Sequence, residues 1–240
     1  MKKALLLLLL LPAISNAQFK DILAKAAEKI AAATKTNNSL DIAAGLKEAL
    51  NKGVTEQVSK LTKTDGFYKN EAVKILLPEE LAKVDKTLRK MGMSKLADQG
   101  ILALNRAAED AVKEATPIFV TAIKDITITD AKSILLGNDN AATLYLQSAT
   151  TTPLYAKFNP VVQQSIGKVG ADVIWTKIIK QYNTLPLVTK VNPDLTDYVT
   201  NKALDGVFKM ITVEEKNIRT NINARTSDVL KKVFALQDKK

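Results

Sequence analysis

The chain of 240 residues contains neither cysteine nor histidine, and these two absences exclude a large part of protein chemistry. Without cysteine there is no disulfide, thiol nucleophile, thiolate metal site or iron–sulfur cluster. Without histidine the usual serine triad, histidine-ligated zinc and haem ligation by histidine are all excluded. Carboxylate pairs and Lys or Tyr bases remain. The composition therefore favours a protein that is not an enzyme, that has no metal site and that needs no cofactor.

Glycine, proline and aromatic residues are also scarce, with 9 Gly, 7 Pro and 5% aromatic side chains. Hydrophobic residues make up 46% of the chain, which is enough to bury a sizeable core. Beyond the N-terminus no segment approaches the roughly 20 apolar residues that a transmembrane helix needs. The composition predicts a globular protein without a transmembrane segment.

The N-terminus has the pattern of a secretory signal peptide. Lys2 and Lys3 precede an apolar run over 4–11, and the small residues Ser15 and Ala17 stand at the minus-three and minus-one positions of a cleavage site. A buried N-terminal helix is the alternative interpretation. No cysteine stands at the junction to carry a lipid, so we expect a periplasmic or secreted protein that is not lipid-anchored. The pattern predicts a signal peptide over 1–17.

Apolar residues recur at spacings of three and four through most of the remaining chain, which is typical of amphipathic helices. We predict an N-terminal amphipathic helix and linker over 18–38 and a single helical domain over 39–240. Alternation with a period of two is nearly absent, and 72–77 is the one stretch that resembles a short strand or a helix end. The predicted fold is all-α, an irregular bundle of about nine to ten helices with at most one short strand.

Proline, glycine and capping residues predict where helices begin and end. One helix should begin at Pro78 and end at Gly92, and Pro117 should kink or divide the long helix that follows. The remaining expectations are a short helix capped by Thr129 or Asp130, a helix over 140–149 that ends before Pro153, two helices within 160–183, and a helix over 194–221.

The 194–221 segment has the longest uninterrupted apolar pattern. Leu204, Phe208, Ile211 and Ile218 form one stripe, and a second stripe adjoins it. A helix with so wide an apolar surface is buried on more than one side. We therefore expect this helix to be central.

The formal charge of +10 falls to +8 when Lys2 and Lys3 are removed with the signal peptide. A basic exported protein would meet anionic lipids and glycolipids rather than nucleic acid. The alternative is that scattered lysines simply solvate helix surfaces. Half of the remaining excess lies in 202–240, where six residues are candidates for an anion-binding patch: Lys209, Lys216, Arg219, Arg225, Lys231 and Lys232.

A polar cluster interrupts the apolar run over 101–112. Asn105 and Glu109 are four residues apart and share one helix face, and Arg106 lies on the adjacent face. The cluster is a solvated face, a buried structural network or a ligand site. Under the third interpretation the candidate ligand-binding residues are Tyr68, Asn105, Arg106, Glu109 and Thr143.

Several separated runs of the sequence resemble the domain of unknown function 4197 family. They cover most of the chain from about residue 46 onward, and a visible departure is Ser227, where a second threonine would be usual. The resemblance implies an exported, helical bacterial protein and brings no activity that could be assigned to a residue. The runs are 65–68, 105–109, 130–137, 141–143, 194–200, 203–208 and 225–234.

Three functional hypotheses follow. The first is non-enzymatic binding of an anionic or amphipathic ligand or envelope partner, such as an anionic lipid, a glycolipid or another protein. The second is a structural or assembly factor that binds only protein. The third is a carboxylate-dependent hydrolase, which needs two converging carboxyl groups. The sequence predicts no nucleic-acid partner and does not define the oligomeric state.

Overall fold

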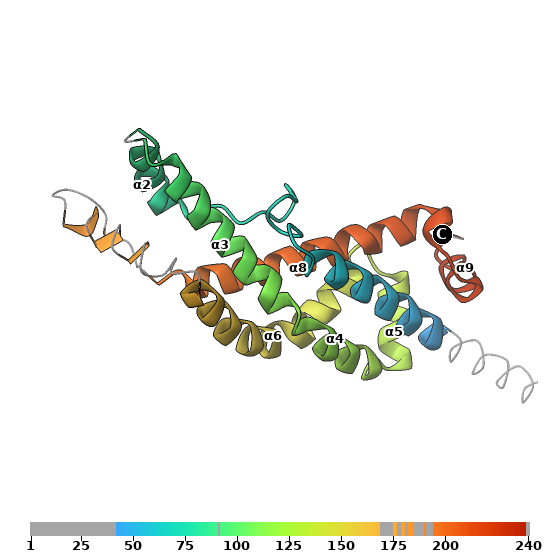
Figure 1. Cartoon of the computed structure of the whole chain (residues 1–240). Helices are drawn as coiled ribbons and strands as arrows, with labels where there is room; N and C mark the ends of the chain where they lie inside the picture. Colours follow the sequence, from blue (N-terminus) through green and yellow to red (C-terminus); the bar gives the residue numbers. More distant parts are fainter. Residues whose placement is uncertain are drawn as a thin grey trace, which may run out of the picture. The chain divides into compact units, whose positions relative to one another are not determined.

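The computed structural model describes residues 42–90, 92–168, 175–176, 179–180, 182–184, 190 and 194–238 (Figure 1). The predicted signal peptide over 1–17 and the predicted helix and linker over 18–38 lie outside the described residues. The chain divides into two units between residues 41 and 42, and the described residues all belong to the second. The fold is all-α, and the described part of the chain contains no β-strand. The prediction of the fold class is thus confirmed.

Residues 42–61 are helical, and the other helices follow in chain order. They are α2 (Glu79–Lys90), α3 (Ser94–Val112), α4 (Ala115–Lys124), α5 (Ile128–Leu136), α6 (Ala141–Lys168), α8 (Thr196–Thr220), the 3-10 turn η1 (Ile222–Ala224) and α9 (Asp228–Phe234).

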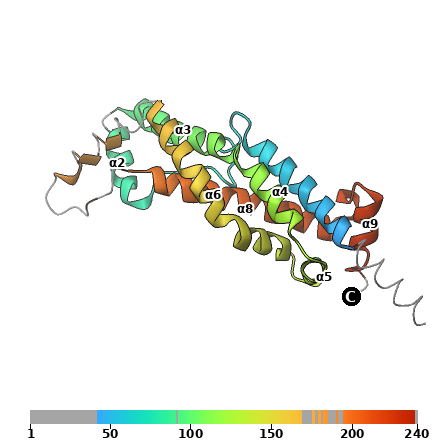
Figure 2. The ribbon, with the colours of Figure 1, turned by 90° about the horizontal axis from the view of Figure 1, so that it is seen from below.

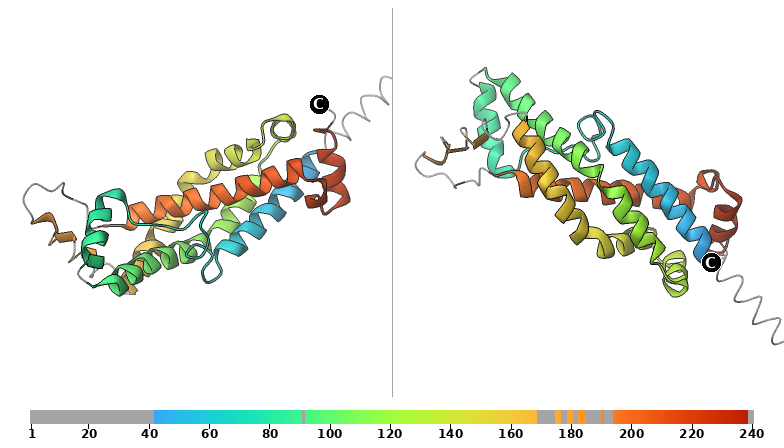
Figure 3. Two further views of the ribbon diagram at one scale, coloured as in Figure 1. Left: turned by 90° about the horizontal axis from the view of Figure 1, so that it is seen from above. Right: turned by 60° about the horizontal axis from the view of Figure 1, so that its bottom comes forward.

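Helix α8 packs against α3 and α6 (Figures 2 and 3). The 42–61 helix adjoins it on another side, where Leu50 and Val54 face Ile211 across a shared cavity. Phe208 of α8 meets Phe119 of α4 edge to face, with ring centroids 6.0 Å apart. Buried side chains therefore surround α8 on several sides, as its wide apolar surface predicts.

Two predicted boundaries are confirmed. The chain turns out of α2 at Gly92, whose φ of +78° is a left-handed conformation that glycine adopts without strain. The long helix is divided before Pro117, with α3 ending at Val112 and α4 beginning at Ala115. Pro117 then stands in the first turn of α4, where a backbone N–H has no helical acceptor in any case.

Two other predictions are wrong. The N-cap of α5 is Thr127 rather than Thr129 or Asp130. Helix α6 continues through Pro153 and Pro160 for 28 residues, which makes it longer than the 25-residue α8. Each proline removes a helical hydrogen bond. The helix persists because a row of side chains recurring every four residues is buried along it: Leu146, Thr150, Leu154, Phe158 and Val162.

The 72–77 stretch is neither a strand nor a helix end, since 72–73 belong to a turn and 74–78 have no regular secondary structure. Its backbone is paired with a side chain of α3 instead of a second strand. Asn105 accepts a hydrogen bond from the Ile75 N–H at 2.8 Å and donates one to the Ile75 carbonyl at 2.8 Å. The Asn105 amide thus supplies the same donor and acceptor that a neighbouring strand would offer, and it satisfies two buried backbone groups.

Candidate functional site

Four of the five predicted ligand-binding residues lie together where the turn over 65–68 meets α3. One Glu109 oxygen accepts from the backbone N–H groups of Phe67 at 3.1 Å and Tyr68 at 3.4 Å. Its other oxygen accepts from Arg106 at 2.6 Å, and Arg106 also donates to Asp65 at 2.6 Å. Asn105 is one turn before Glu109 and pairs with Ile75. We refer to Asp65, Asn105, Arg106 and Glu109 as the Glu109 network.

The electrostatics of the Glu109 network favour the charged forms of Asp65 and Arg106. Hydrogen bonds from Lys69 and then from Arg106 hold the pKa of the Asp65 carboxyl below its ordinary value. The carboxylate of Glu109 raises the pKa of Arg106. Asp65 itself has a φ of +69°, a conformation that Asp and Asn adopt more readily than most residues. The arrangement fastens the 65–78 connection to α3, which is the interpretation of the cluster as a structural network.

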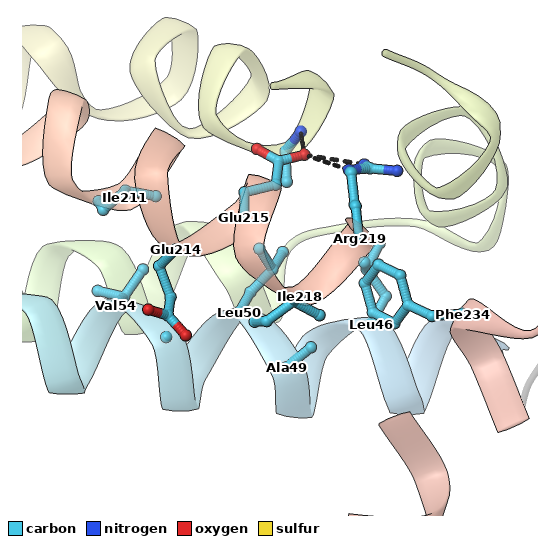
Figure 4. Close-up of a pocket in the computed structure, with 12 residues that line it drawn as sticks. Leu46, Ala49, Leu50, Val54, Ile211, Glu214, Glu215, Ile218, Arg219 and Phe234 are labelled. Atoms are coloured by element: carbon cyan, nitrogen blue, oxygen red, sulfur yellow. Dashed lines mark hydrogen bonds and ion pairs between the residues drawn. The ribbon is translucent and has the colours of Figure 1, made fainter. Parts of the chain in front are cut away.

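The fifth predicted residue, Thr143, belongs to a second network around Glu215 of α8. Glu215 accepts from the backbone N–H groups of Ala142 at 2.9 Å and Thr143 at 2.8 Å, and from the Thr143 hydroxyl at 2.8 Å. Arg219, one turn further along α8, donates two hydrogen bonds to the same carboxylate (Figure 4). A negative charge therefore stands at the N-terminus of α6, where the helix dipole stabilises it.

Arg219 also binds the opposite end of the preceding helix. Its guanidinium donates to the carbonyl oxygens of Ile134 at 2.8 Å and Leu135 at 3.0 Å, which are among the last residues of α5, and to Gln237 at 2.7 Å. A positive charge at a helix C-terminus is also favourable. The Glu215–Arg219 pair thus fixes the end of α5 and the start of α6 to α8.

The six residues of the predicted anion patch fall into two groups. Arg219 and Arg225 are both 3% exposed, and Arg225 pairs with Asp238 and with the carbonyls of Ile218 and Arg219. The other four are exposed: Lys209, Lys216, Lys231 and Lys232. The two arginines therefore stabilise the C-terminal part internally, and only the lysines face solvent.

A cavity between the 42–61 helix and α8 is too small for a ligand. Its volume is about 20 Å³, which is room for about one water molecule. Figure 4 shows its apolar lining, with Leu46 and Leu50 opposite Ile218, while Glu214 is directed toward the 42–61 helix. Gln57 on that helix donates to Glu214 at 2.9 Å.

A groove of about 480 Å³ between α4 and α6 is within the size range of small-molecule sites. Most of its lining is apolar. The two threonines that line it direct their hydroxyls elsewhere, because Thr121 donates to the Pro117 carbonyl and Thr150 to the Leu146 carbonyl. The lining residues are Pro117, Ile118, Thr121, Ala122, Asp125, Tyr145, Ala149, Thr150, Pro153 and Lys157; we refer to this surface as the α4–α6 groove.

Opposite charges mark the two ends of the groove. Tyr145 and Lys157 are twelve residues apart on α6, a separation of about 18 Å along the helix axis. Burial, followed by the negative charges of Asp130 and Asp125, raises the pKa of the Tyr145 hydroxyl. Asp125 therefore lies at the Tyr145 end, and Lys157 lies at the other. A ligand in the groove would find an apolar middle, a cation at one end and a carboxylate at the other.

The sequence did not lead us to predict the buried network around Glu215 or the α4–α6 groove. The apolar stripe over 204–218 has a gap of six residues between Ile211 and Ile218, and Glu215 stands at the position that would fill it. That spacing was a sign that its carboxylate is buried. The groove had no comparable signal, because α4 and α6 contribute to it from separate parts of the chain.

Among the described residues, each carboxyl pKa shift that is resolved is downward, at Glu56, Asp65, Asp110, Asp130 and Asp238. A general acid needs a raised pKa instead. Within the described ranges no three acidic side chains gather in a way that could hold a metal ion. The helices of this same part include none with the length and apolarity to span a membrane.

The comparisons with known proteins agree with the family resemblance of the sequence. A model of the family described as protein of unknown function (DUF4197) matches residues 36–235. No curated protein and no solved structure matches the chain. The runs that carry the resemblance include 65–68, 105–109 and 141–143, which supply most of the Glu109 network and the helix end that Glu215 binds.

Proposed function

This chain belongs to the DUF4197 family of proteins of unknown function, and we propose that it is a non-enzymatic binding protein that holds an anionic amphipathic ligand in the α4–α6 groove. The observation that carries the proposal is the combination of an apolar groove of about 480 Å³ with Lys157 at one end. An apolar chain would lie over Ala149 and Ile118, and its anionic head would pair with Lys157. Asp125 at the far end repels an anion and so sets the direction of binding.

The proposal includes export. The pattern over 1–17 is that of a signal peptide, and a periplasmic or secreted protein encounters anionic lipids and glycolipids. The exposed lysines of the C-terminal part add a long-range attraction toward such ligands. Under this proposal they assist encounter, and the groove provides the binding site.

A structural or assembly factor that binds only protein is the second candidate. It is favoured by the openness of the groove, since Pro117, Thr121, Ala149, Pro153 and Lys157 are all exposed. Small-molecule ligands are usually more deeply enclosed. A polypeptide helix with an apolar stripe would cover the same surface.

Native mass spectrometry of the protein purified from its own host, before and after solvent extraction, tests the proposal. We expect a small molecule in stoichiometric amount that solvent removes. The variant Ala149→Glu places a charge on the apolar floor and should abolish co-purification. Ala82→Glu is the matched control, because Ala82 is an exposed alanine of α2 outside the groove.

Each other result decides between the candidates. A complex with another polypeptide that Ala149→Glu disrupts would move the assignment to the second candidate. Retention of the small molecule by Ala149→Glu would show that the α4–α6 groove is not its site. A protein without any ligand or partner would contradict both candidates.

A further inference from the structure

One backbone carbonyl in the wall of the α4–α6 groove lacks its helical hydrogen-bond donor. In an α-helix the carbonyl of residue 149 receives a hydrogen bond from the N–H of residue 153. Residue 153 is proline, which has no N–H. Ala149 and Pro153 both line the groove and both are exposed. A residue that lines the groove therefore has a backbone carbonyl without an intrahelical donor.

This acceptor lies close to the cationic end of the groove. Helical carbonyls point toward the C-terminus, so the Ala149 oxygen is directed toward Pro153. Lys157 is one turn beyond Pro153, about 6 Å along the axis, and helical side chains lean back toward the N-terminus. The Lys157 ammonium and the Ala149 carbonyl are thus close enough along the groove to contact the same end of one ligand.

The nearby hydroxyls do not satisfy this carbonyl. Thr150 donates to the Leu146 carbonyl at 2.6 Å, and Thr151 donates to the Gln147 carbonyl at 2.6 Å. On the other wall, Thr121 donates to the Pro117 carbonyl at 3.0 Å. These bonds occupy the hydroxyl protons of the threonines on both walls of the groove.

We infer that the groove selects an anionic amphipathic chain that carries a hydroxyl or amide N–H a few bonds from its charged head. Lys157 pairs with the head, the Ala149 carbonyl accepts from the ligand's donor, and the apolar floor takes the rest of the chain. The inference rests on the proposed function, since it names the class of ligand for the same groove. A ligand without a hydrogen-bond donor covers this carbonyl, removes its hydrogen bond to water and does not replace it. Because of that lost hydrogen bond, such a ligand binds more weakly than one that carries a donor.

Helix α6 contains its own control for this chemistry. Pro160 deprives the Ala156 carbonyl of its donor in the same way. Ala156 and Pro160 are not among the residues that line the groove. Pro160→Ala therefore restores a helical hydrogen bond outside the site, whereas Pro153→Ala restores one inside it. Alanine suits a helix interior, so both variants should fold.

The experiment measures binding of palmitate and of β-hydroxypalmitate to the purified protein by isothermal titration calorimetry. For the wild type and for Pro160→Ala we expect β-hydroxypalmitate to bind about two- to tenfold more tightly, the range of one neutral hydrogen bond. Pro153→Ala should bind both fatty acids with equal affinity, because the new backbone N–H then donates to the Ala149 carbonyl. Lys157→Ala should weaken both ligands to a similar degree.

The outcomes separate the inference from the proposed function. Equal affinities in the wild type, or a preference that survives in Pro153→Ala, would overturn the inference. Binding of both fatty acids that Ala149→Glu abolishes would still support the proposed function in that case. Failure of both to bind the wild type would overturn the two together.

Discussion

At the scale of single residues, Glu215 and Arg219 form a buried ion pair whose charges the surrounding fold must compensate. Their side chains are 5% and 1% exposed, so both charges are removed from water. They are stabilised by each other and by hydrogen bonds to the ends of α5 and α6. Removing one member of a buried pair leaves the other charge without compensation. We expect Arg219→Ala to lower the free energy of unfolding by about 3–5 kcal/mol.

Urea denaturation followed by circular dichroism measures this loss. The matched control is Lys216→Ala, because Lys216 is an exposed cation of the same helix and should change stability by no more than about 0.5 kcal/mol. Similar small effects for both variants would mean that Arg219 is solvated in solution and available to anions. That result would restore it to the predicted patch.

The assignment of Arg219 and Arg225 to an anion patch illustrates what residue types alone leave open. A basic residue on a helix is usually solvated, and the periodicity of 194–221 does not distinguish a lysine on the surface from an arginine between helices. The Glu109 network was easier to anticipate, because Asn105, Arg106 and Glu109 are neighbours on one helix. Their partners in the turn over 65–68 required the tertiary structure.

At the scale of elements, a reciprocal cap starts α5. The Thr127 hydroxyl accepts from the Asp130 N–H at 3.1 Å, and the Asp130 carboxylate accepts from the Thr127 N–H at 3.0 Å. The sequence pattern favoured Thr129 or Asp130 as the cap, which is two or three residues too late. Thr127→Ala should therefore lower the free energy of unfolding by about 1 kcal/mol.

The variant Thr129→Ala is the control in the same thermal or urea denaturation experiment. Thr129 is exposed and lies inside the first turn of α5, where alanine is a better helix former. A larger loss for Thr129→Ala than for Thr127→Ala would contradict the capping assignment and support the boundary that the sequence predicts.

Helix α6 shows why local signals also mislead at this scale. Pro153 predicts a helix boundary, because a proline in a helix interior costs about 3 kcal/mol of helix stability relative to alanine. The row of buried side chains on either side of it outweighs that cost, because α6 packs on both α3 and α8. The same proline then provides the unpaired carbonyl on which the inferred ligand selectivity depends.

At the scale of the whole molecule, the lack of histidine and cysteine predicts an unusual pH dependence of stability. No side chain has an ordinary pKa between about 5 and 9. The pKa values of Asp65, Asp110, Asp130 and Asp238 are lowered in the fold, and those of Tyr145 and Tyr155 are raised. Titration of the side chains therefore changes the stability of the fold only at acidic and at alkaline pH.

The direction of the stability change at acidic and at alkaline pH follows from the linkage between proton binding and folding. Carboxyl groups with lowered pKa contribute stability above about pH 4, and this contribution is lost as the pH falls through their folded values. Tyrosines with raised pKa contribute below about pH 10, and this is lost as the pH rises through theirs. Thermal denaturation should give a plateau from about pH 6 to 9 with a decline on each side. A step near pH 6.5 would contradict the prediction.

The sequence by itself determined the fold class, the division of the chain near Pro117, the exclusion of thiol and imidazole chemistry, and the family. The first three depend on composition and on periodicity within one helix, which are local properties, and the family depends on separated runs of residues that resemble it. The tertiary structure decided which charges are buried, that α6 continues through two prolines, and that α4 and α6 enclose an apolar groove. Burial and grooves arise where separate helix faces meet, and the free energy of that packing is not contained in any one segment.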